Sequence, residues 1–384
     1  MDNQPGTNSI LTMGSGFSNV GYGITLGRLR IDSGDTVQLS EVSTSLTMAD
    51  TGFPGAGEIL INGTLRLPGS PTEGGAGNQL LGPKVLNGTG RLLLGQPGRQ
   101  PEILGNTTNN TTIEGAARFG RSNSGGNAFP IFNNGLVNAN ITGQVLEFAT
   151  FGATNSATMQ ATNGATLRFS QGNMTNSTTG LIAANGAGAP AGSLTIAEFG
   201  GSFVTTGGNL SATAGGRLRI NGEARWKDLT VTGPVDALGP LTLEGIVTNN
   251  GVINVSAAGA RLDGIYTVDF APASTVTLRG GGEVILDKPI SVNGLDTAFG
   301  VQNTIWRIEQ QTIRGRGQIG RRETNVSAPR MVNRGTLLAD RNGQTLAVSL
   351  GSLDNQAGGF LRATGGGILD LGVVGPLLNT GGTI

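Results

Sequence analysis

Catalysis by this chain would have to rest on carboxylates. The 384 residues include no histidine and no cysteine, which excludes Ser-His-Asp and Cys-His nucleophiles and histidine-ligated metal sites. Two carboxylates held close together can still cleave a glycosidic bond, one as acid and the other as base or nucleophile. The candidate catalytic residues are Asp263 with Asp287, or Glu223 with Asp228, if folding brings the members of a pair together. Acidic residues are few and mostly occupy alternating exposed positions, so we favour a protein without catalytic activity.

The turn Asp32-Ser33-Gly34-Asp35 carries two carboxylates, the ligand type that calcium prefers. It lacks the further oxygen ligands of a calcium loop. An ordinary turn stabilised by aspartate is therefore the favoured interpretation. We predict no metal and no other cofactor.

Asparagine followed two residues later by Ser or Thr recurs along the chain, and this is the acceptor pattern for N-glycosylation. A chain rich in Asn and Thr produces the pattern by chance, and stacked Asn side chains at the corners of a repeat structure would use the same residues. We favour the stacked-Asn interpretation. The residues concerned are Asn62, Asn87, Asn106, Asn109, Asn110, Asn140, Asn173, Asn176, Asn209, Asn254 and Asn325.

Basic side chains concentrate in segment 301–334, which holds seven arginines against Glu309 and Glu323. Guanidinium groups beside an indole could hold an acidic glycan or another partner through ion pairing and stacking. The alternative, which we favour, is that these arginines lie on a solvated face and pair with acids of neighbouring repeats. The candidate contact residues are Trp306, Arg307, Arg314, Arg316, Arg321 and Arg322.

Composition limits the remaining partners. Charge balances at 25 basic and 25 acidic residues, and only 13% of the chain is charged, so no global field should attract nucleic acid or an anionic membrane. No apolar stretch is long enough to cross a bilayer. With 67 glycines and 4% aromatic residues, the chain is poorly supplied for a thick globular core. A repeat architecture with a thin interior needs no such core.

Five segments share one pattern of apolar residues, and they indicate how the chain is organised. An aliphatic residue is followed at +2 by Ala or Val, then by Gly, then by Leu, and two residues later by a further residue that is apolar in four of the five. Because apolar and polar residues alternate between these points, the elements are short strands with one buried face. Gly and Asn at the gaps suit tight corners. The segments begin at Met159, Leu210, Ile253, Leu337 and Leu361.

The spacing of these segments predicts an all-β fold, a single-stranded parallel β-solenoid with about 21–25 residues per coil. Leu337 to Leu361 is 24 residues, which is one coil, and Ile253 to Leu337 is 84, interpreted as four. Roughly 17 coils would give a rod on the order of 80 Å long. We predict an atypical first coil or a loose, strand-donating arm at 1–27 and the solenoid at 28–384. Corner loops are expected near 68–79, 120–127 and 186–192.

Short motifs resemble those of a known group of proteins. The chain has GEILINGTLRL at 57–67, NGTGRLLL at 87–94, VNRGTLLA at 332–339 and LNTGGTI at 378–384. They resemble the Asn-x-Gly-Thr-Leu and Gly-Thr-Leu-x-Leu units of right-handed β-helical bacterial surface proteins, namely autotransporter passengers with their associated β-strand repeats and haemagglutinin-like adhesins. This resemblance implies a right-handed winding and an extracellular or cell-surface location. Residues 1–9 lack the basic region and apolar core of a signal peptide, so we expect the exported form to have lost it.

The ends of a solenoid expose unpaired strand edges. Ile384 falls 23 residues after Leu361, where the next coil would open, so we expect a further coil to cover that edge. The coil would come from the remainder of a longer adhesin or from another copy joined head to tail. The residues expected at the two assembly ends are Ile10, Leu11, Phe17, Ile24, Leu377, Leu378 and Ile384.

The function predicted from the sequence is that of a non-catalytic extracellular structural protein, an adhesin rod or filament subunit on the bacterial surface. Its predicted partners are copies of itself or the rest of a longer adhesin, and a surface glycan. We predict no binding of nucleic acid and no membrane insertion. The alternative is a β-helical polysaccharide lyase or a tailspike-like glycosidase that uses the carboxylates named above.

Overall fold

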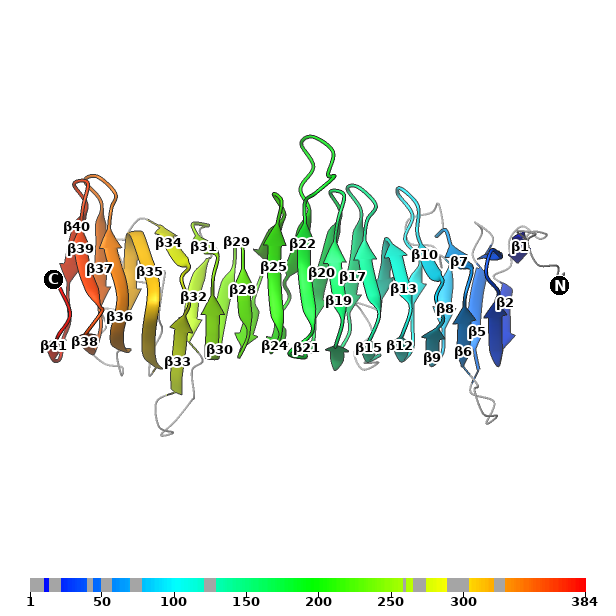
Figure 1. The fold of residues 1–384 in the computed structure, drawn as a ribbon, viewed down its shortest axis with the longest axis horizontal. Coiled ribbons are helices and arrows are strands. Elements are labelled where there is room, and N and C mark those ends of the chain that lie inside the picture. The colour runs from blue at the N-terminus through cyan, green and yellow to red at the C-terminus, as the bar shows by residue number, and fades with distance from the viewer. Residues whose placement is uncertain are drawn as a thin grey trace. The chain divides into compact units, whose positions relative to one another are not determined.

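The structure, a computed structural model, is built from β-strands. It describes residues 10–13, 22–39, 44–49, 57–69, 78–120, 129–257, 260–264, 274–288, 304–320 and 329–384. Every regular element within these ranges is a strand, which confirms the predicted all-β class (Figure 1). The chain divides into two compact units, 1–198 with 213–217 and 199–212 with 218–384.

The strands are short in the first half of the chain. They are β1 (Ile10–Met13), β2 (Tyr22–Leu26), β3 (Arg28–Ile31), β4 (Thr36–Leu39), β5 (Thr44–Met48), β6 (Glu58–Ile61), β7 (Thr64–Leu67), β8 (Gln79–Leu81), β9 (Lys84–Asn87), β10 (Arg91–Leu94), β11 (Glu102–Ile103), β12 (Thr107–Asn109), β13 (Thr112–Gly115), β14 (Ala117–Phe119), β15 (Ile131–Asn133), β16 (Leu136–Ala139), β17 (Val145–Ala149), β18 (Ala153–Asn155), β19 (Thr158–Ala161), β20 (Thr166–Gln171), β21 (Asn173–Asn176), β22 (Leu181–Asn185) and β23 (Ile196–Phe199).

Later strands include three long ones that turn a corner without losing their pairing, β30, β35 and β36. The series continues with β24 (Phe203–Thr206), β25 (Asn209–Thr213), β26 (Arg217–Ile220), β27 (Ala224–Lys227), β28 (Thr230–Thr232), β29 (Pro234–Ala237), β30 (Pro240–Asn249), β31 (Val252–Val255), β32 (Arg261–Gly264), β33 (Ser274–Arg279), β34 (Glu283–Asp287), β35 (Thr304–Gly320), β36 (Arg330–Ala339), β37 (Thr345–Ser349), β38 (Ser352–Gln356), β39 (Phe360–Ala363), β40 (Ile368–Leu371) and β41 (Leu377–Thr380).

In the first unit, each strand pairs in parallel with the strand three places later. Thus β6 pairs with β9, β7 with β10 and β8 with β11, and the rule continues to β19 with β22. Three strands therefore make one coil, and each coil lies directly on the previous one. This arrangement is a parallel β-solenoid, as predicted. The right-handed winding stays a prediction.

Coil length varies more than the sequence suggested. Successive coils advance by 24, 22 and 21 residues along the Asn109 row, but by 17 between Ala224 and Leu241 and by 31 between Ile253 and Val284. The 84 residues from Ile253 to Leu337 consequently span three coils, through Val284 and Ile313, and the prediction of four was wrong. Longer connections inside these coils account for the difference.

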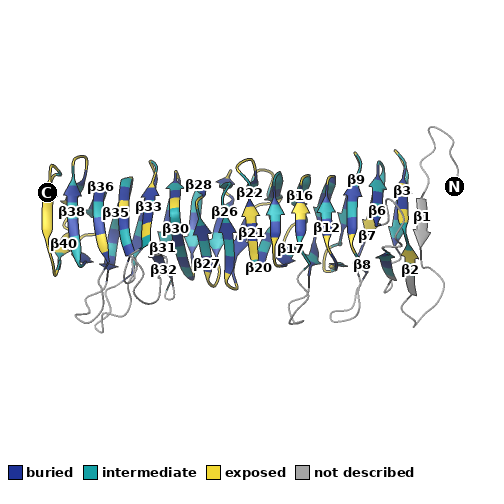
Figure 2. Ribbon diagram, turned by 90° about the horizontal axis from the view of Figure 1, so that it is seen from below, coloured by how far each residue is buried: buried dark blue, intermediate teal, exposed yellow. Residues whose placement is uncertain are grey.

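The interior of each unit is a thin stack of aligned side chains. In the first unit Leu92, Ile113, Val137, Met159 and Ile182 occupy one register position in successive coils, and all are essentially buried. Their neighbours along each strand point outward, so buried and exposed residues alternate (Figure 2). Fully burying one such side chain stabilises the fold by about 1.5–3 kcal/mol. The stack thus replaces the thick core that the composition could not supply.

Aromatic residues add a second stack in the first unit. The rings of Phe119, Phe148 and Phe169 lie in successive coils, with centroids 4.7 Å and 5.6 Å apart and nearly parallel planes. Their alignment follows from the strand register, which pairs each Phe with the next. A few aromatic residues are sufficient when they are stacked in this way.

Corners between strands need glycine where the backbone of one coil meets that of the next. Gly115 has a φ of 118°, and a Cβ atom there would lie 1.9 Å from the carbonyl oxygen of Leu94. Gly315 in the second unit has a φ of 115° and the same conflict with Leu286. The high glycine content therefore serves coil-to-coil stacking.

The expected loops and first segment are partly described. Residues 186–192 lie between β22 and β23, whereas 70–77 and 121–128, which hold most of the other two expected loops, fall outside the described residues. Of segment 1–27, β1 pairs with β4 and β2 with β5. Ile10, Leu11 and Ile24 therefore lie in this chain's own ladder, which corresponds to an atypical first coil and not to a loose arm. Phe17 lies outside the described residues.

Candidate functional site

Trp306 belongs to the interior, and its predicted role in stacking on a glycan is wrong. On β35 the residues Trp306 and Ile308 point inward, while Arg307 between them is exposed. Trp306 has no exposed surface and lies in register between Val276 and Met331. The period-two alternation of a strand places the indole on the buried face, whatever the charge of its neighbours.

The arginines of β35 pair with acids of neighbouring coils, which is the interpretation that we favoured. Arg314 bridges two coils, with Nε 2.9 Å from Glu283 Oε2 and Nη1 2.9 Å from Asp340 Oδ2. These hydrogen bonds, Glu283 first, raise the pKa of Arg314 further above its usual range. The Arg316 Nε lies 2.6 Å from Asp287 Oδ1. Arg321 and Arg322 are outside the described residues.

The four candidate catalytic carboxylates engage four different groups. Asp263 is buried beside Arg261, and burial raises its pKa while Arg261 opposes that shift. Asp287 pairs with Arg316, Glu223 accepts a hydrogen bond from Ser202, and Asp228 accepts one from the Ile246 amide. In the part of the chain that the structure describes, no hydrogen bond or ion pair joins the members of either proposed pair.

The turn at Asp32 is an ordinary hydrogen-bonded turn. The amide of Asp35 donates to the carbonyl of Asp32 at 3.1 Å, Gly34 has a φ of 86°, and Arg30 Nε donates to Asp32 Oδ1 at 2.8 Å. Among the described residues there is no group of three or more His, Cys, Asp or Glu that could hold a metal ion.

Buried asparagines form an inner ladder at one corner of each unit. In the first unit the ladder consists of Asn109, Asn133, Asn155 and Asn176, whose amides donate from each coil to the next at 2.7, 2.7 and 2.8 Å. In the second unit it consists of Asn333, Asn355 and Asn379, at 2.8 and 2.9 Å. The ladder interpretation is thereby confirmed for Asn109 and Asn176.

Each ladder amide also satisfies the backbone at its corner. Asn109 Oδ1 accepts from the Thr111 amide at 3.1 Å, and Asn333 Oδ1 accepts from the Gly335 amide at 3.1 Å. Removing such a side chain leaves several buried polar groups without partners, at about 1–3 kcal/mol each. The ladder therefore fixes the corner and holds adjacent coils together.

The residue after each ladder position points outward, and these residues form an outer row. In the first unit the outer row is Asn87, Asn110, Asn134 and Ser156, which bond to one another at 2.8, 2.9 and 2.7 Å. The corners at 110–111, 134–135 and 156–157 all enclose two residues. Equal corner lengths keep neighbouring outer-row side chains within reach of one another.

The outer row of the second unit has a different composition. It consists of Thr248, Arg279, Glu309, Arg334 and Gln356. Arg279 Nε donates to Thr248 Oγ1 at 3.0 Å, and Arg334 Nε donates to Gln356 Oε1 at 2.8 Å. Glu309 lies between the two arginines in register, and within the described ranges no residue is placed within hydrogen-bonding or ion-pair distance of its carboxylate.

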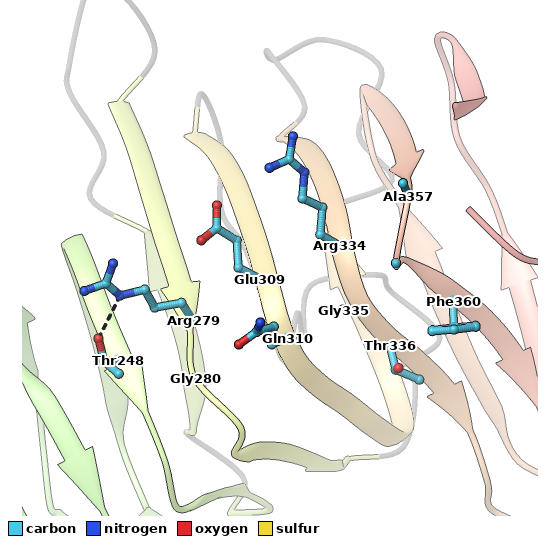
Figure 3. Close-up of a pocket in the computed structure, with 11 residues that line it drawn as sticks. Thr248, Arg279, Gly280, Glu309, Gln310, Arg334, Gly335, Thr336, Ala357 and Phe360 are labelled. Carbon is cyan, nitrogen blue, oxygen red and sulfur yellow. Dashed lines mark hydrogen bonds between the residues drawn. The ribbon is translucent and has the colours of Figure 1, made fainter. Parts of the chain in front are cut away.

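Unequal corners open a hollow beside this outer row (Figure 3). The corners of four successive coils are 279–282, 309–311, 334–335 and 356–359. The two middle corners are shorter than their neighbours, and the corner hollow that results has a volume of about 720 Å³. Its lining includes Arg279, Glu309, Gln310, Arg334 and Phe360.

Gln311 makes the base of the corner hollow rigid. It is fully buried and reaches past Gly280, where its Nε2 donates to the carbonyls of Arg279, Gly280 and Asn249. Its Oε1 accepts from Asn249 Nδ2 at 2.9 Å. A glutamine thus carries the amide contact across a coil that has only glycines at its corner.

Lys84 is a buried cation in the first unit. Its Nζ donates to the carbonyl oxygens of Gly82 and Leu104 at 2.8 and 2.9 Å. Burial lowers the pKa of Lys84 to about 7. The group therefore changes charge near neutral pH, a property that the sequence did not indicate.

Apolar side chains are exposed at β41 and beyond. Leu377 is 43% exposed, Leu378 50% and Ile384 67%. Leu377 continues the interior row of Trp306, Met331 and Leu353, so it points to the position that the next inward side chain would cover.

Comparison with protein-family models, with curated proteins and with solved structures finds no match. No helix among the described residues is long and apolar enough to span a membrane.

Proposed function

We propose that this chain is a non-catalytic structural scaffold, an adhesin rod or filament subunit of the bacterial surface. The observation that carries the proposal is the use of polar side chains between coils. The inner ladders join coil to coil, and arginines such as Arg314 and Arg168 pair with carboxylates of adjacent coils. Side chains committed to stacking suit a protein whose task is to keep its length and rigidity.

The exposed edge of β41 supports stacking at that end. Leu377 and Leu378 present apolar surface there, and a further coil laid on this edge would bury it. A second copy of the chain would provide such a coil through a head-to-tail contact, which propagates into a filament when it does not close. The surface location is supported by the motif resemblance at 57–67 and 332–339.

Electron microscopy at increasing protein concentration tests the proposal. We expect filaments, and we expect Leu377→Asp to abolish them because the charge would be buried in the contact. Leu238→Asp is the matched control, because Leu238 is also exposed, at 42%, and lies away from β41. Isolated particles at high concentration, or filaments that persist in Leu377→Asp, would contradict end-to-end assembly.

Carboxylate-based glycan cleavage is the second candidate. Its support is the raised pKa of Asp263, a property of general acids. Release of reducing or unsaturated sugars from acidic polysaccharides, lost in Asp263→Asn, would establish it. Arg261 holds this carboxylate, so we rank the scaffold first.

A further inference from the structure

We propose that the corner hollow of the second unit binds an acidic oligosaccharide. The hollow is a consequence of chain geometry, since two short corners, 309–311 and 334–335, lie between longer ones. Its volume of about 720 Å³ falls in the range of small-molecule sites, about 300–1,000 Å³. Such a site goes beyond a scaffold role, because length and rigidity do not require it.

Two guanidinium groups supply the attraction for an anion. Arg279 and Arg334 are both exposed, and each uses its Nε for a neighbour in the outer row. These bonds orient the two side chains on the same side of the sheet (Figure 3). The terminal nitrogens of a guanidinium form a planar fork that matches a carboxylate or a sulfate. The hollow therefore presents oriented donors to one anionic group.

The Glu309 carboxylate narrows the class of ligand. It lies between the two arginines, so the three groups carry a net charge of only +1. A closely spaced polyanion such as nucleic acid would meet this carboxylate unfavourably. A sugar chain with separated acidic groups would instead offer it hydroxyl donors. An alternation of charge and hydroxyl groups is what uronic acid and sulfated saccharides provide.

Gln310 is held in a conformation that an L residue rarely adopts. Its φ is 63°, and the corresponding corners of neighbouring coils use Gly280 and Gly358, with φ values of 102° and 85°. The side chain is exposed at the corner hollow and puts an amide there, next to Glu309 (Figure 3). A strained residue where glycine would be at ease points to use of its side chain.

Phe360 supplies apolar surface at the far side of the hollow. It lines the hollow together with Ala357 and Gly358, and Arg362 stacks on its ring with 4.5 Å between Cζ and the centroid. The apolar face of a sugar ring packs on such a surface, while its hydroxyls meet Thr336 and Gln310. The lining thus combines the contacts that a saccharide needs.

Isothermal titration of the full chain with defined oligosaccharides tests the proposal. The probes are an oligogalacturonate, a sulfated oligosaccharide of equal length and a neutral malto-oligosaccharide. We expect binding of at least one acidic probe, at least tenfold tighter than of the neutral one. The two acidic arms show whether the anionic group is a carboxylate or a sulfate. No binding of either, or equal binding of the neutral probe, would overturn the proposal.

Variants separate binding from folding. Arg279→Gln with Arg334→Gln should weaken the acidic probe at least tenfold, whereas Arg91→Gln, an exposed arginine of the first unit, should leave it unchanged. Gln310→Gly should weaken binding severalfold with an unchanged or higher melting temperature, because glycine suits this backbone. Retained affinity in these variants would contradict the site. The assay is independent of filament formation, so it fails or succeeds separately from the scaffold proposal.

Discussion

The two units solve the same corner problem inward and differ outward. Both bury a row of asparagines that bond from coil to coil, Asn109 to Asn176 in the first unit and Asn333 to Asn379 in the second. In the first unit the outer row Asn87 to Ser156 bonds to itself, so its polar groups are occupied. In the second unit the outer row holds Arg279, Glu309 and Arg334 beside the corner hollow.

Corner length explains this difference. Three equal corners in the first unit bring Asn110, Asn134 and Ser156 to the same height, where short amides and hydroxyls can reach one another. Corners of four, three, two and four residues in the second unit prevent such alignment. The inner ladder therefore sets stability, and the outer row is free to set what the surface binds.

The largest effect should follow from cutting the inner ladder of the first unit. Asn133→Ala removes bonds with Asn109, Asn155 and the Thr158 carbonyl, and leaves their polar groups buried without partners. We expect a loss of about 3–5 kcal/mol in the free energy of unfolding, measured with denaturant. Asn134→Ala in the outer row is the control and should cost about 0.5–1 kcal/mol. Equal losses would show that the two rows are not distinct.

A pH dependence should mark the first unit through Lys84. Burial lowers the pKa of Lys84 to about 7 in the folded chain, while an unfolded lysine titrates at about 10.4. Between these values the unfolded chain binds more protons, so the free energy of unfolding should rise with pH, by on the order of 2 kcal/mol. Below pH 7 the buried cation keeps the fold at its lower stability. Unfolding titrations of Lys84→Met should lack this rise, and an identical pH profile would contradict the assignment.

In the second unit, the bridge from Arg314 to two coils should contribute less. Arg314→Gln removes the ion pairs with Glu283 and Asp340, which are partly exposed to solvent. We expect a loss of about 1 kcal/mol that shrinks at 1 M salt. Arg307→Gln, which changes an exposed arginine of the same strand, serves as the control. A loss that salt does not alter would argue against an ionic contribution.

The smallest effect, of opposite sign, should come from Gln310→Gly. Replacing a residue at a φ of 63° with glycine relieves strain, and we expect a gain of about 0.5–1 kcal/mol in the free energy of unfolding. The comparison variant is Gln311→Gly, which removes buried hydrogen bonds and should destabilise. Thermal melts distinguish the two. A loss for Gln310→Gly would show that its side chain serves the fold.

The alternation of apolar residues carried most of the fold prediction. It identified Met159 and Leu361 as inward residues and excluded helices, because a period of two is a property of local sequence. The same alternation applies to Trp306 and Ile308, yet the arginines around Trp306 favoured a surface role. Burial of Trp306 shows that strand parity outweighs the charge of neighbours.

The site could not be found from period alone. Arg279, Glu309 and Arg334 meet because they follow the ends of three stacked strands, but they are separated by 30 and 25 residues. These unequal separations depend on connections elsewhere in each coil, which also led to the wrong count between Ile253 and Leu337. A search for charged residues directly after strand ends would have found them.

The inner ladder can be tested most directly with a double-mutant cycle on Asn133 and Asn155. Their amides bond at 2.7 Å only if one coil lies on the next in the register described. We predict that the two alanine substitutions couple by about 1–3 kcal/mol in the free energy of unfolding. Strictly additive losses would mean that the two side chains do not meet, and the stacked arrangement of coils would be contradicted.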